Sequence, residues 1–322
     1  EFSFDVQGVK HRVAMVGENN ADYKQLAADM KKMVETTIDV WGTLPVKKYL
    51  FIVEHVESGG GGLEHLNSTV LMMSRNNYSK PDKYVNFMSL VAHEYFHLWN
   101  VKRLRPKELG PFDYDNENYT ELLWFFEGFT AYYDELLLWR AGFVTEEEYL
   151  KRLAVNVERT ENRPGVRVQT LAEASYDAWI KAYRRNENSA NTTISYYGKG
   201  SLVAVSLDIE LAHATKGKAN LGNLMRDLYS LYLKNPEIGI SHDDIVKAAS
   251  KIAGRDLSSE FNSWVYSTDV FDYKSTFEKV GMEFTAVQEK EKVELGTSSK
   301  IEDGKLVVQS VKRGTGAYTA GV

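Results

Sequence analysis

The chain of 322 residues contains no cysteine. It therefore has no disulfide, no thiolate metal ligand and no cysteine nucleophile, so any catalysis must use other side chains. Basic residues are in the minority, since 39 Lys and Arg stand against 45 Asp and Glu, giving a net charge of −6. Without a basic excess there is no electrostatic footprint for nucleic acid or an anionic membrane, and we expect neither as a partner.

Long apolar runs are missing as well. No stretch has the roughly 20 apolar residues that a membrane-spanning helix needs, and the N-terminus does not resemble a signal peptide. The first residue is Glu rather than Met, so we interpret the chain as a processed or trimmed piece. The lack of cysteine leaves the compartment open, and with the trimmed N-terminus it favours the periplasm or cell envelope over the cytoplasm. A hydrophobic content of 43% is ample for a large core.

The most informative stretch of the sequence is His93-Glu94-Tyr95-Phe96-His97. Side chains four residues apart lie on one helix face, so both imidazoles can point at one ion, with Glu94 able to reach a water beside it. Leu, Val, Phe and Trp flank the motif at helical spacing, which predicts a buried helix that excludes bulk water. The pattern indicates a zinc hydrolase, and the alternative is a pair of core histidines bound to carbonyl groups.

A third zinc ligand must come from a separate element. Glu127 lies in the apolar and aromatic run from Leu122 to Tyr133. A lone carboxylate in such surroundings is costly unless a cation neutralises it, and zinc would supply that cation. The alternative is a Glu127 that faces water from a half-buried helix. We predict His93, His97 and Glu127 as the ligands of one Zn²⁺ per chain.

These motifs resemble the gluzincin metallopeptidases, in which a Glu on the next helix follows the two histidines. The sequence around Glu127 resembles that of the aminopeptidase N family. In that family, however, only a short interval separates the second histidine from the third ligand. Here 29 residues separate His97 from Glu127. That interval, and the stretch from Trp99 to Pro106, resemble instead the glycyl aminopeptidase family, whose members commonly carry a C-terminal PDZ domain. The resemblance runs from about residue 45 to the end.

A glycine run precedes Leu63-Glu64-His65. Glycine lets a backbone approach a ligand closely, so Gly62 and Glu64 can line a cleft, whereas a flexible hairpin loop is the alternative. The stretch is similar to the G-x-M-E-N motif of aminopeptidase N relatives, in which the Glu holds the substrate's α-ammonium. This resemblance implies that Glu64 binds a free N-terminus. Leu63 and His65 depart from the motif, and no role carries over to the fifth position.

Two further stretches have an open interpretation. Lys102, Arg103 and Arg105 form a basic run that is either solvated or binds a substrate carboxylate or carbonyl. Tyrosine is common in the chain, so Tyr196 and Tyr197 could simply be packing residues. A phenol can also donate to a developing oxyanion. Resemblance to the Y-x-K-G motif of aminopeptidase N relatives favours Tyr197 in that role, with Tyr196 as the alternative.

The predicted elements change character along the chain. Residues 1–17 are interpreted as the end of an N-terminal β domain. Asp22 opens a helix that runs to about Val40 and is closed by Gly42, and residues 49–53 form a buried strand. Helices are predicted at about 120–140, 145–162, 170–184, 199–215, 221–234, 241–253 and 257–266. A mixed α/β lobe followed by a helical lobe is the thermolysin-like arrangement. We therefore predict an α+β fold with a catalytic domain over 18–275. Residues 276–322 are predicted to be the start of a PDZ domain, because the sequence of 305–322 is similar to one.

Taken together, the motifs and the resemblance predict a zinc aminopeptidase. Glu94 would act as general base and acid, Tyr197 would stabilise the oxyanion, and Glu64 would hold the free N-terminus of a peptide substrate. The resemblance points to small first residues such as Gly or Ala. An endopeptidase of the same chemistry is one alternative. A zinc-stabilised scaffold, whose complete PDZ domain binds C-terminal peptides, is another, although Glu94 would then have no purpose.

Overall fold

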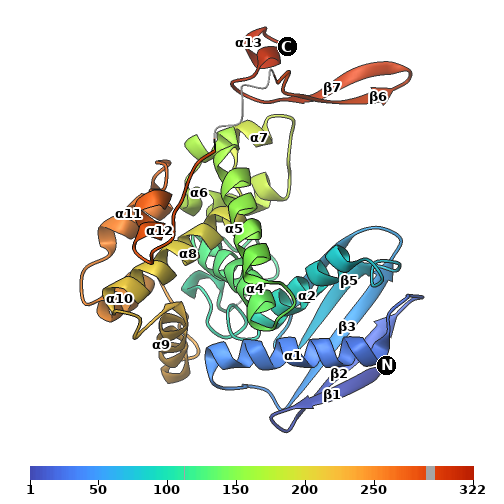
Figure 1. The fold of residues 1–322 in the computed structure, drawn as a ribbon, viewed down its shortest axis with the longest axis vertical. Helices are drawn as coiled ribbons and strands as arrows, with labels where there is room; N and C mark the ends of the chain where they lie inside the picture. Colours follow the sequence, from blue (N-terminus) through green and yellow to red (C-terminus); the bar gives the residue numbers. More distant parts are fainter. Residues whose placement is uncertain (112, 288–293) are drawn as a thin grey trace. The chain divides into compact units, whose positions relative to one another are not determined.

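The computed structural model describes residues 1–111, 113–287 and 294–322. A five-stranded sheet with the strand order β1-β2-β3-β5-β4 occupies its N-terminal part (Figure 1). The three central strands are parallel, while β1 and β4 run antiparallel at the edges. The strands are β1 (Phe2–Val6), β2 (Val9–Val16), β3 (Lys48–Val56), β4 (Gly60–Glu64) and β5 (Ser68–Ser74).

Strands β1, β2, β3 and β5 of this sheet carry buried side chains on one face. Along β3, the buried side chains of Tyr49, Phe51 and Val53 alternate with more exposed neighbours, as a strand with one face against a core requires. The helices α1 (Tyr23–Trp41) and α2 (Pro81–Phe96) pack against each other, with α1 on β1 and α2 on β4 and β5. The sheet thus supports α2, the helix that contains the histidine motif.

Helix α1 begins and ends at the residues that the sequence predicts. The Asp22 carboxylate accepts hydrogen bonds from the backbone N–H groups of Lys24 and Gln25, which otherwise have no partner in the first turn. Gly42 ends the helix with a φ of 74°, a left-handed conformation that costs glycine little. The predicted helix over residues 22–40 is therefore confirmed.

A buried histidine links the sheet to α2. The His11 ring, fully buried in β2, contacts the Val9 carbonyl through Nδ1 at 3.0 Å and the Tyr95 hydroxyl through Nε2 at 2.8 Å. Burial lowers the pKa of His11 to about 4, although the Val9 carbonyl and Asp5 oppose the shift. The ring is therefore neutral at pH 7 and can be buried without a counter-ion. Its bond to Tyr95 fixes α2 at the residue after Glu94.

Residues 1–17 contribute two strands to this same sheet. β1 and β2 form an antiparallel hairpin, and β2 continues in parallel pairing with β3. The N-terminal hairpin is thus continuous with the sheet beneath α2. Its assignment to the end of a preceding β domain stays a prediction, as do the domain boundaries at residues 18, 275 and 276.

Most of the chain after residue 120 is helical, which confirms the mixed α and β architecture. The α-helices are α3 (Leu123–Phe126), α4 (Gly128–Arg140), α5 (Glu146–Glu161), α6 (Leu171–Tyr176), α7 (Ser189–Thr192), α8 (Tyr196–Ala214), α9 (Leu221–Lys234), α10 (His242–Ala253), α11 (Ser258–Tyr266) and α12 (Tyr273–Glu278). Short 3₁₀ segments lie at η1 (Lys107–Leu109) and η2 (Pro164–Arg167), and a π-helix at η3 (Ala178–Ala182).

The helix predicted over residues 120–140 is interrupted. α3 ends at Phe126, Glu127 caps it, and α4 starts at Gly128. Gly128 lies so close to α8 that a Cβ there would come within 2.6 Å of the Gly200 backbone. Two glycines therefore allow the backbones of these segments to touch, a contact that apolar periodicity does not report. The break leaves Glu127 at a helix junction.

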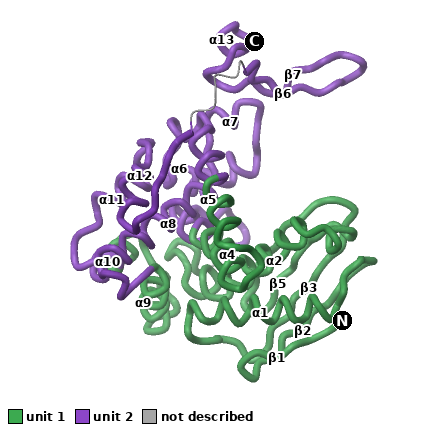
Figure 2. Tube along the Cα trace, viewed as in Figure 1, with its two compact units in different colours: residues 1–112, 129–154, 221–248 green, residues 113–128, 155–220, 249–322 purple. Residues whose placement is uncertain are grey.

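The chain divides into two compact units, which Figure 2 distinguishes by colour. One unit comprises residues 1–112, 129–154 and 221–248, and it includes the sheet, α1, α2 and α9. The other comprises residues 113–128, 155–220 and 249–322, and it includes α3, α6, α8, α11 and α12. Each unit is therefore assembled from three separate stretches of the sequence.

The C-terminal residues form a small hairpin. β6 (Thr297–Glu302) pairs antiparallel with β7 (Lys305–Val311), and α13 (Gly316–Thr319) follows. The Asn191 side chain donates to the Val311 carbonyl at 2.7 Å and accepts from the Arg313 N–H at 2.8 Å. β7 lies in the stretch whose sequence is similar to a PDZ domain, whereas residues 288–293, within the predicted start of that domain, lie outside the described residues.

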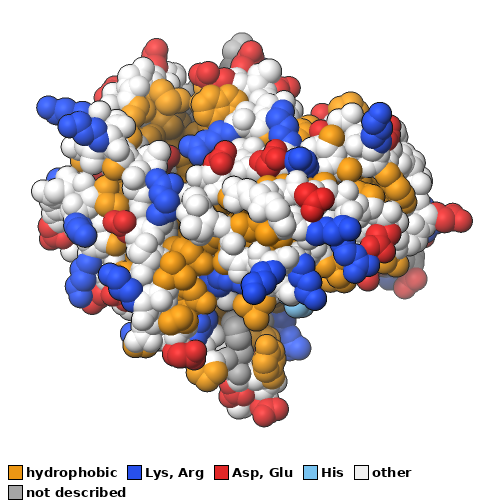
Figure 3. Space-filling view, turned by 90° about the horizontal axis from the view of Figure 1, so that it is seen from below, with side chains coloured by type: hydrophobic (Ala, Val, Ile, Leu, Met, Phe, Trp, Pro, Cys, Tyr) orange, Lys and Arg blue, Asp and Glu red, His pale blue; other side chains and the backbone are white. Residues whose placement is uncertain are grey.

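The surface carries both signs of charge. On the face in Figure 3, acidic and basic side chains are interspersed, with apolar patches between them. Across the described ranges, no helix combines the length and apolarity needed to cross a membrane.

A buried lysine at the start of α8 gives a prediction about stability. Lys199 is 1% exposed, its Nζ has no hydrogen-bond partner among the described residues, and it lies 5.4 Å from the centroid of the Phe271 ring. Burial lowers its pKa to about 8 from 10.5. Lys199→Met should raise the free energy of unfolding by about 1–3 kcal/mol, because an ammonium with poor solvation is replaced by an apolar chain of similar length.

The pH dependence of this effect has a definite sign. Between pH 8 and 10.5 the unfolded state binds more protons at Lys199, so the wild type gains stability as pH rises and the advantage of Lys199→Met narrows. Urea unfolding at several pH values measures the difference in free energy of unfolding between the wild type and Lys199→Met. Lys218→Met, at an exposed position, is the control. A Lys199→Met protein no more stable than the wild type below pH 8 would contradict this account.

Candidate metal centre

The two histidines of α2 lie at its C-terminal end. His93 is in the last turn and His97 is the residue that caps the helix, with its backbone N–H bonded to the His93 carbonyl. Their ring centroids are 4.7 Å apart, His93 is partly buried, and His97 is 1% exposed. The helix therefore places both imidazoles on one side, as the four-residue spacing predicts.

Hydrogen bonds fix the orientation of both rings. His93 Nδ1 lies 2.8 Å from Asp134 Oδ2, and His97 Nδ1 lies 2.6 Å from the Asn100 carbonyl oxygen. Because each of these partners accepts a hydrogen bond, Nδ1 carries the proton in the neutral ring and Nε2 carries the lone pair. This is the orientation in which histidine commonly binds a metal.

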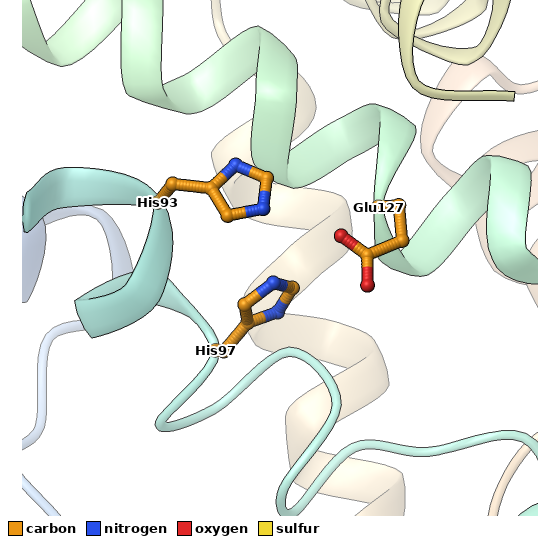
Figure 4. Close-up of side chains that lie close together, drawn as sticks. All are labelled: His93, His97 and Glu127. Carbon is orange, nitrogen blue, oxygen red and sulfur yellow. The ribbon is translucent and has the colours of Figure 1, made fainter. Parts of the chain in front are cut away.

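Glu127 completes a group of three potential ligands. One ligand atom from each of His93, His97 and Glu127 lies within 4.8 Å of the other two (Figure 4). Two imidazoles and one carboxylate are a donor set that suits Zn²⁺, which takes three protein ligands and a fourth exchangeable one in catalytic sites. The residues present thus fit a zinc ion by their chemistry and their proximity.

Glu94 lies beside the same group and is 4% exposed. A Cβ on Gly62 would come within 2.4 Å of Glu94 Oε1, so β4 passes this carboxylate at a distance that only glycine permits. Ligand atoms of Glu64, Glu94 and His97 also lie within 4.8 Å of one another. The glycine run therefore forms an edge strand that brings Gly62 and Glu64 to the histidine motif.

Glu64 is itself paired with a basic residue. Lys102 Nζ lies 3.3 Å from Glu64 Oε1, and the two side chains are 20% and 17% exposed. The neighbouring Arg103 donates to the Leu66 and Leu98 carbonyls, while Arg105 donates to the Pro236 and Glu237 carbonyls. The basic run is therefore engaged in contacts within the protein rather than fully solvated, and a role in binding substrate stays a prediction.

The tyrosines at the start of α8 form a stacked pair. Ser195 caps this helix, and the Tyr196 and Tyr197 rings are 4.8 Å apart. Burial and then the Glu127 carboxylate raise the pKa of Tyr197. Burial and then the hydrogen bond between Tyr196 and Tyr183 raise that of Tyr196, with Glu127 a lesser cause. Both phenols thus stay protonated near neutral pH.

Two of the residues that complete this arrangement were not predicted. Asp134 follows Glu127 by seven residues, a helical spacing that could have indicated a shared face, but the surrounding run gave no reason to single it out. Tyr183 caps the C-terminal end of η3, beyond any motif. Its contacts with the α8 tyrosines come from tertiary folding.

Solved structures with a similar fold are metallopeptidases of the aminopeptidase N type. The chain is 34% identical to an aminopeptidase N family protein from Idiomarina loihiensis, with a TM-score of 0.91 over 100% of this chain. An M1 zinc metallopeptidase from Deinococcus radiodurans, bound to a Tyr-Ser-Ala substrate, matches 81% of this chain and 49% of its own length, with 13% identity and a TM-score of 0.50. The second likeness concerns the fold alone.

Residues 86–203 match the M61 glycyl aminopeptidase family model. The resemblance to the glycyl aminopeptidase family is thus confirmed over this matched segment. The matched segment contains His93, Glu94, His97, Glu127 and Tyr197. The chain spans 58% of the Idiomarina loihiensis protein. No match was found among curated proteins.

The His93–Asp134 contact gives a prediction about metal affinity. Asp134→Asn should weaken Zn²⁺ binding by about 10- to 100-fold, because the charged acceptor that orients and polarises His93 is lost. Competition with a chromophoric chelator measures the affinity. Glu135→Gln is the matched control, since Glu135 pairs with Arg152 at 3.1 Å instead. Equal affinities for the wild type and Asp134→Asn would contradict the proposed orientation of His93.

Proposed function

We propose that this protein is a zinc aminopeptidase that hydrolyses the first peptide bond of peptides with a free N-terminus. The observation that carries the proposal is the proximity of His93, His97 and Glu127, with Glu94 between the two histidines in sequence. His93, His97 and Glu127 would hold one Zn²⁺. Zinc held there would polarise the scissile carbonyl and make a nearby water more acidic.

Glu94 is the proposed general base and acid. Its carboxylate takes a proton from the attacking water and then delivers that proton to the nitrogen of the departing amine. Burial of Glu94 keeps this exchange away from bulk solvent, and the close approach of Gly62 restricts where the carboxylate can lie. A site that only stabilised the fold would not need this residue, which argues against a non-catalytic scaffold.

Tyr197 is the proposed oxyanion donor. Its hydroxyl keeps its proton at neutral pH and can donate a hydrogen bond to the carbonyl oxygen as negative charge develops there. Glu127 ranks directly after burial among the causes that raise the pKa of Tyr197, whereas for Tyr196 it comes after two effects of Tyr183, which supports this choice. Tyr183, which hydrogen-bonds to the pair, would help orient the donor.

Glu64 is the proposed anchor for the substrate's α-ammonium. Its carboxylate lies near Glu94 and His97, so an amine held there would place the first peptide bond beside the general base. Gly62, on the same strand, is proposed to line the substrate site with its backbone. The match to the glycyl aminopeptidase family supports a preference for small first residues such as Gly or Ala, which we include in the proposal.

Residues 276–322 are proposed as the start of a PDZ domain that binds C-terminal peptides when complete. The β6–β7 hairpin supports this assignment. We retain a catalytic domain over residues 18–275, and a periplasmic or cell-envelope location, as parts of the same proposal.

Glu94→Gln tests the proposed reaction. The variant should retain zinc but lose about 10³-fold in kcat, because the group that accepts the water proton is replaced by a neutral amide. Hydrolysis of a panel of aminoacyl anilides measures it, and Glu121→Gln, an exposed glutamate, is the control. A chelator should abolish wild-type turnover and added Zn²⁺ restore it. Full turnover by zinc-loaded Glu94→Gln would refute the role.

Glu64→Gln tests the aminopeptidase specificity. For a peptide with a free N-terminus, kcat/KM should fall by about 10- to 100-fold, since the amine loses a charged hydrogen-bond acceptor. The N-acetylated form of the same peptide should be affected less, because it has no ammonium. An equal loss on both peptides would favour the endopeptidase alternative and leave the zinc chemistry intact.

A further inference from the structure

The carboxylate proposed to bind the substrate amine already contacts an ammonium group of the protein. Lys102 Nζ is 3.3 Å from Glu64 Oε1, and both side chains are mostly buried. An amine-binding site would ordinarily offer a carboxylate without a resident cation. The contact between Lys102 and Glu64 therefore bears directly on how the site would bind a substrate amine.

The position of Lys102 is fixed by the metal-binding segment. Its backbone N–H donates to the His97 carbonyl at 3.1 Å, and the N–H of Leu104 donates to the Trp99 carbonyl at 2.8 Å. Arg103 donates to the Leu66 carbonyl, on the turn that follows Glu64. The turn that carries Lys102 is thus tied both to His97 and to the segment after β4.

The local charges explain why a cation is useful there. Glu64 and Glu94 offer carboxylate oxygens within 4.8 Å of each other, and two such charges repel in partly buried surroundings. The Lys102 ammonium offsets this repulsion. A substrate's α-ammonium could do the same, so one positive charge suffices at this place and two would compete for Glu64.

We propose that Lys102 is a specificity-determining residue that occupies Glu64 until the α-ammonium of a substrate displaces it. The inference rests on the proposed function, and it concerns only how the amine site selects substrates. A peptide with a free N-terminus must open the Lys102–Glu64 pair, whereas a blocked peptide leaves the pair intact. Lys102 thereby reduces the ratio by which the site favours free over blocked N-termini.

The geometry is compatible with such an exchange. Side chains that are 20% and 17% exposed retain some access to water, so the separated lysine can be solvated. Lysine has a flexible stem of four methylene groups and a compact charge, which allows the ammonium to move while its backbone stays fixed. The exchange breaks the ion pair between Lys102 and Glu64 and forms one between the substrate's α-ammonium and Glu64. Glu64 is therefore paired with one positive charge before and after the exchange.

The test measures binding without turnover. In the zinc-loaded Glu94→Gln protein, calorimetry gives the Kd of a Gly-Ala peptide with a free N-terminus and of its N-acetylated form. Adding Lys102→Met should raise the ratio of acetylated to free Kd by about tenfold, through tighter binding of the free peptide. Lys102→Arg should keep the wild-type ratio, as should Lys107→Met, which removes an exposed lysine nearby.

A double-mutant cycle assigns the effect to Glu64. In the Glu64→Gln background, Lys102→Met should leave the Kd ratio within twofold of that in Glu64→Gln alone, because the carboxylate for which the two cations compete is gone. With Glu94 restored, Lys102→Met should lower KM for the free peptide and leave kcat unchanged.

The outcomes separate this inference from the proposed function. Weaker binding of the free peptide by Lys102→Met would mean that the lysine positions Glu64, and it would overturn the inference. So would an unchanged Kd ratio, or no binding of either peptide. If the ratio shifts as expected but the zinc-loaded wild type hydrolyses neither peptide, the proposed catalytic function fails and the role of Lys102 stands.

Discussion

The packing of α2 against the buried face of the sheet is the constraint on which the candidate site depends. Tyr95, whose hydroxyl meets His11 at 2.8 Å, points to the sheet, so the flanking Glu94 and Phe96 are directed to other sides of the helix. The aromatic contacts of Tyr95 with Tyr49 and Phe51 add apolar burial to this joint. Rotation of α2 would disturb these contacts and the direction of both histidines together.

Partnered carboxylates are the second theme of this region. Carboxylates are costly to bury, and three of them near α2 have a partner within the same compact unit: Asp134 has the ring N–H of His93, Glu135 has Arg152, and Glu64 has Lys102. Asp134 orients His93, a proposed zinc ligand, and Lys102 contacts Glu64, the proposed amine anchor. The same side chains that lower the cost of folding thus also set the direction and charge of groups proposed to contact metal or substrate.

The sequence predicted the features that depend on local pattern. The Asp22 and Gly42 boundaries of α1 and the helix that carries His93 and His97 follow from capping and periodicity, and the structure confirms them. It brings Glu127 near the two histidines, while the roles assigned to these residues stay predictions. The break at Gly128, the His93–Asp134 contact and the Lys102–Glu64 pair depend on segments that meet only after folding, so no local pattern encodes them.

The missing side chain at Gly62 connects strand pairing to the proposed chemistry. Gly62 is paired with Leu71, and in this register the strand passes Glu94 without a Cβ in the way. A slip of β4 along β5 that puts Leu63 in the place of Gly62 would bring a side chain against the Glu94 carboxylate. The register of this edge strand therefore decides whether Glu94 has the space it occupies, so strand pairing and the position of the proposed general base depend on each other.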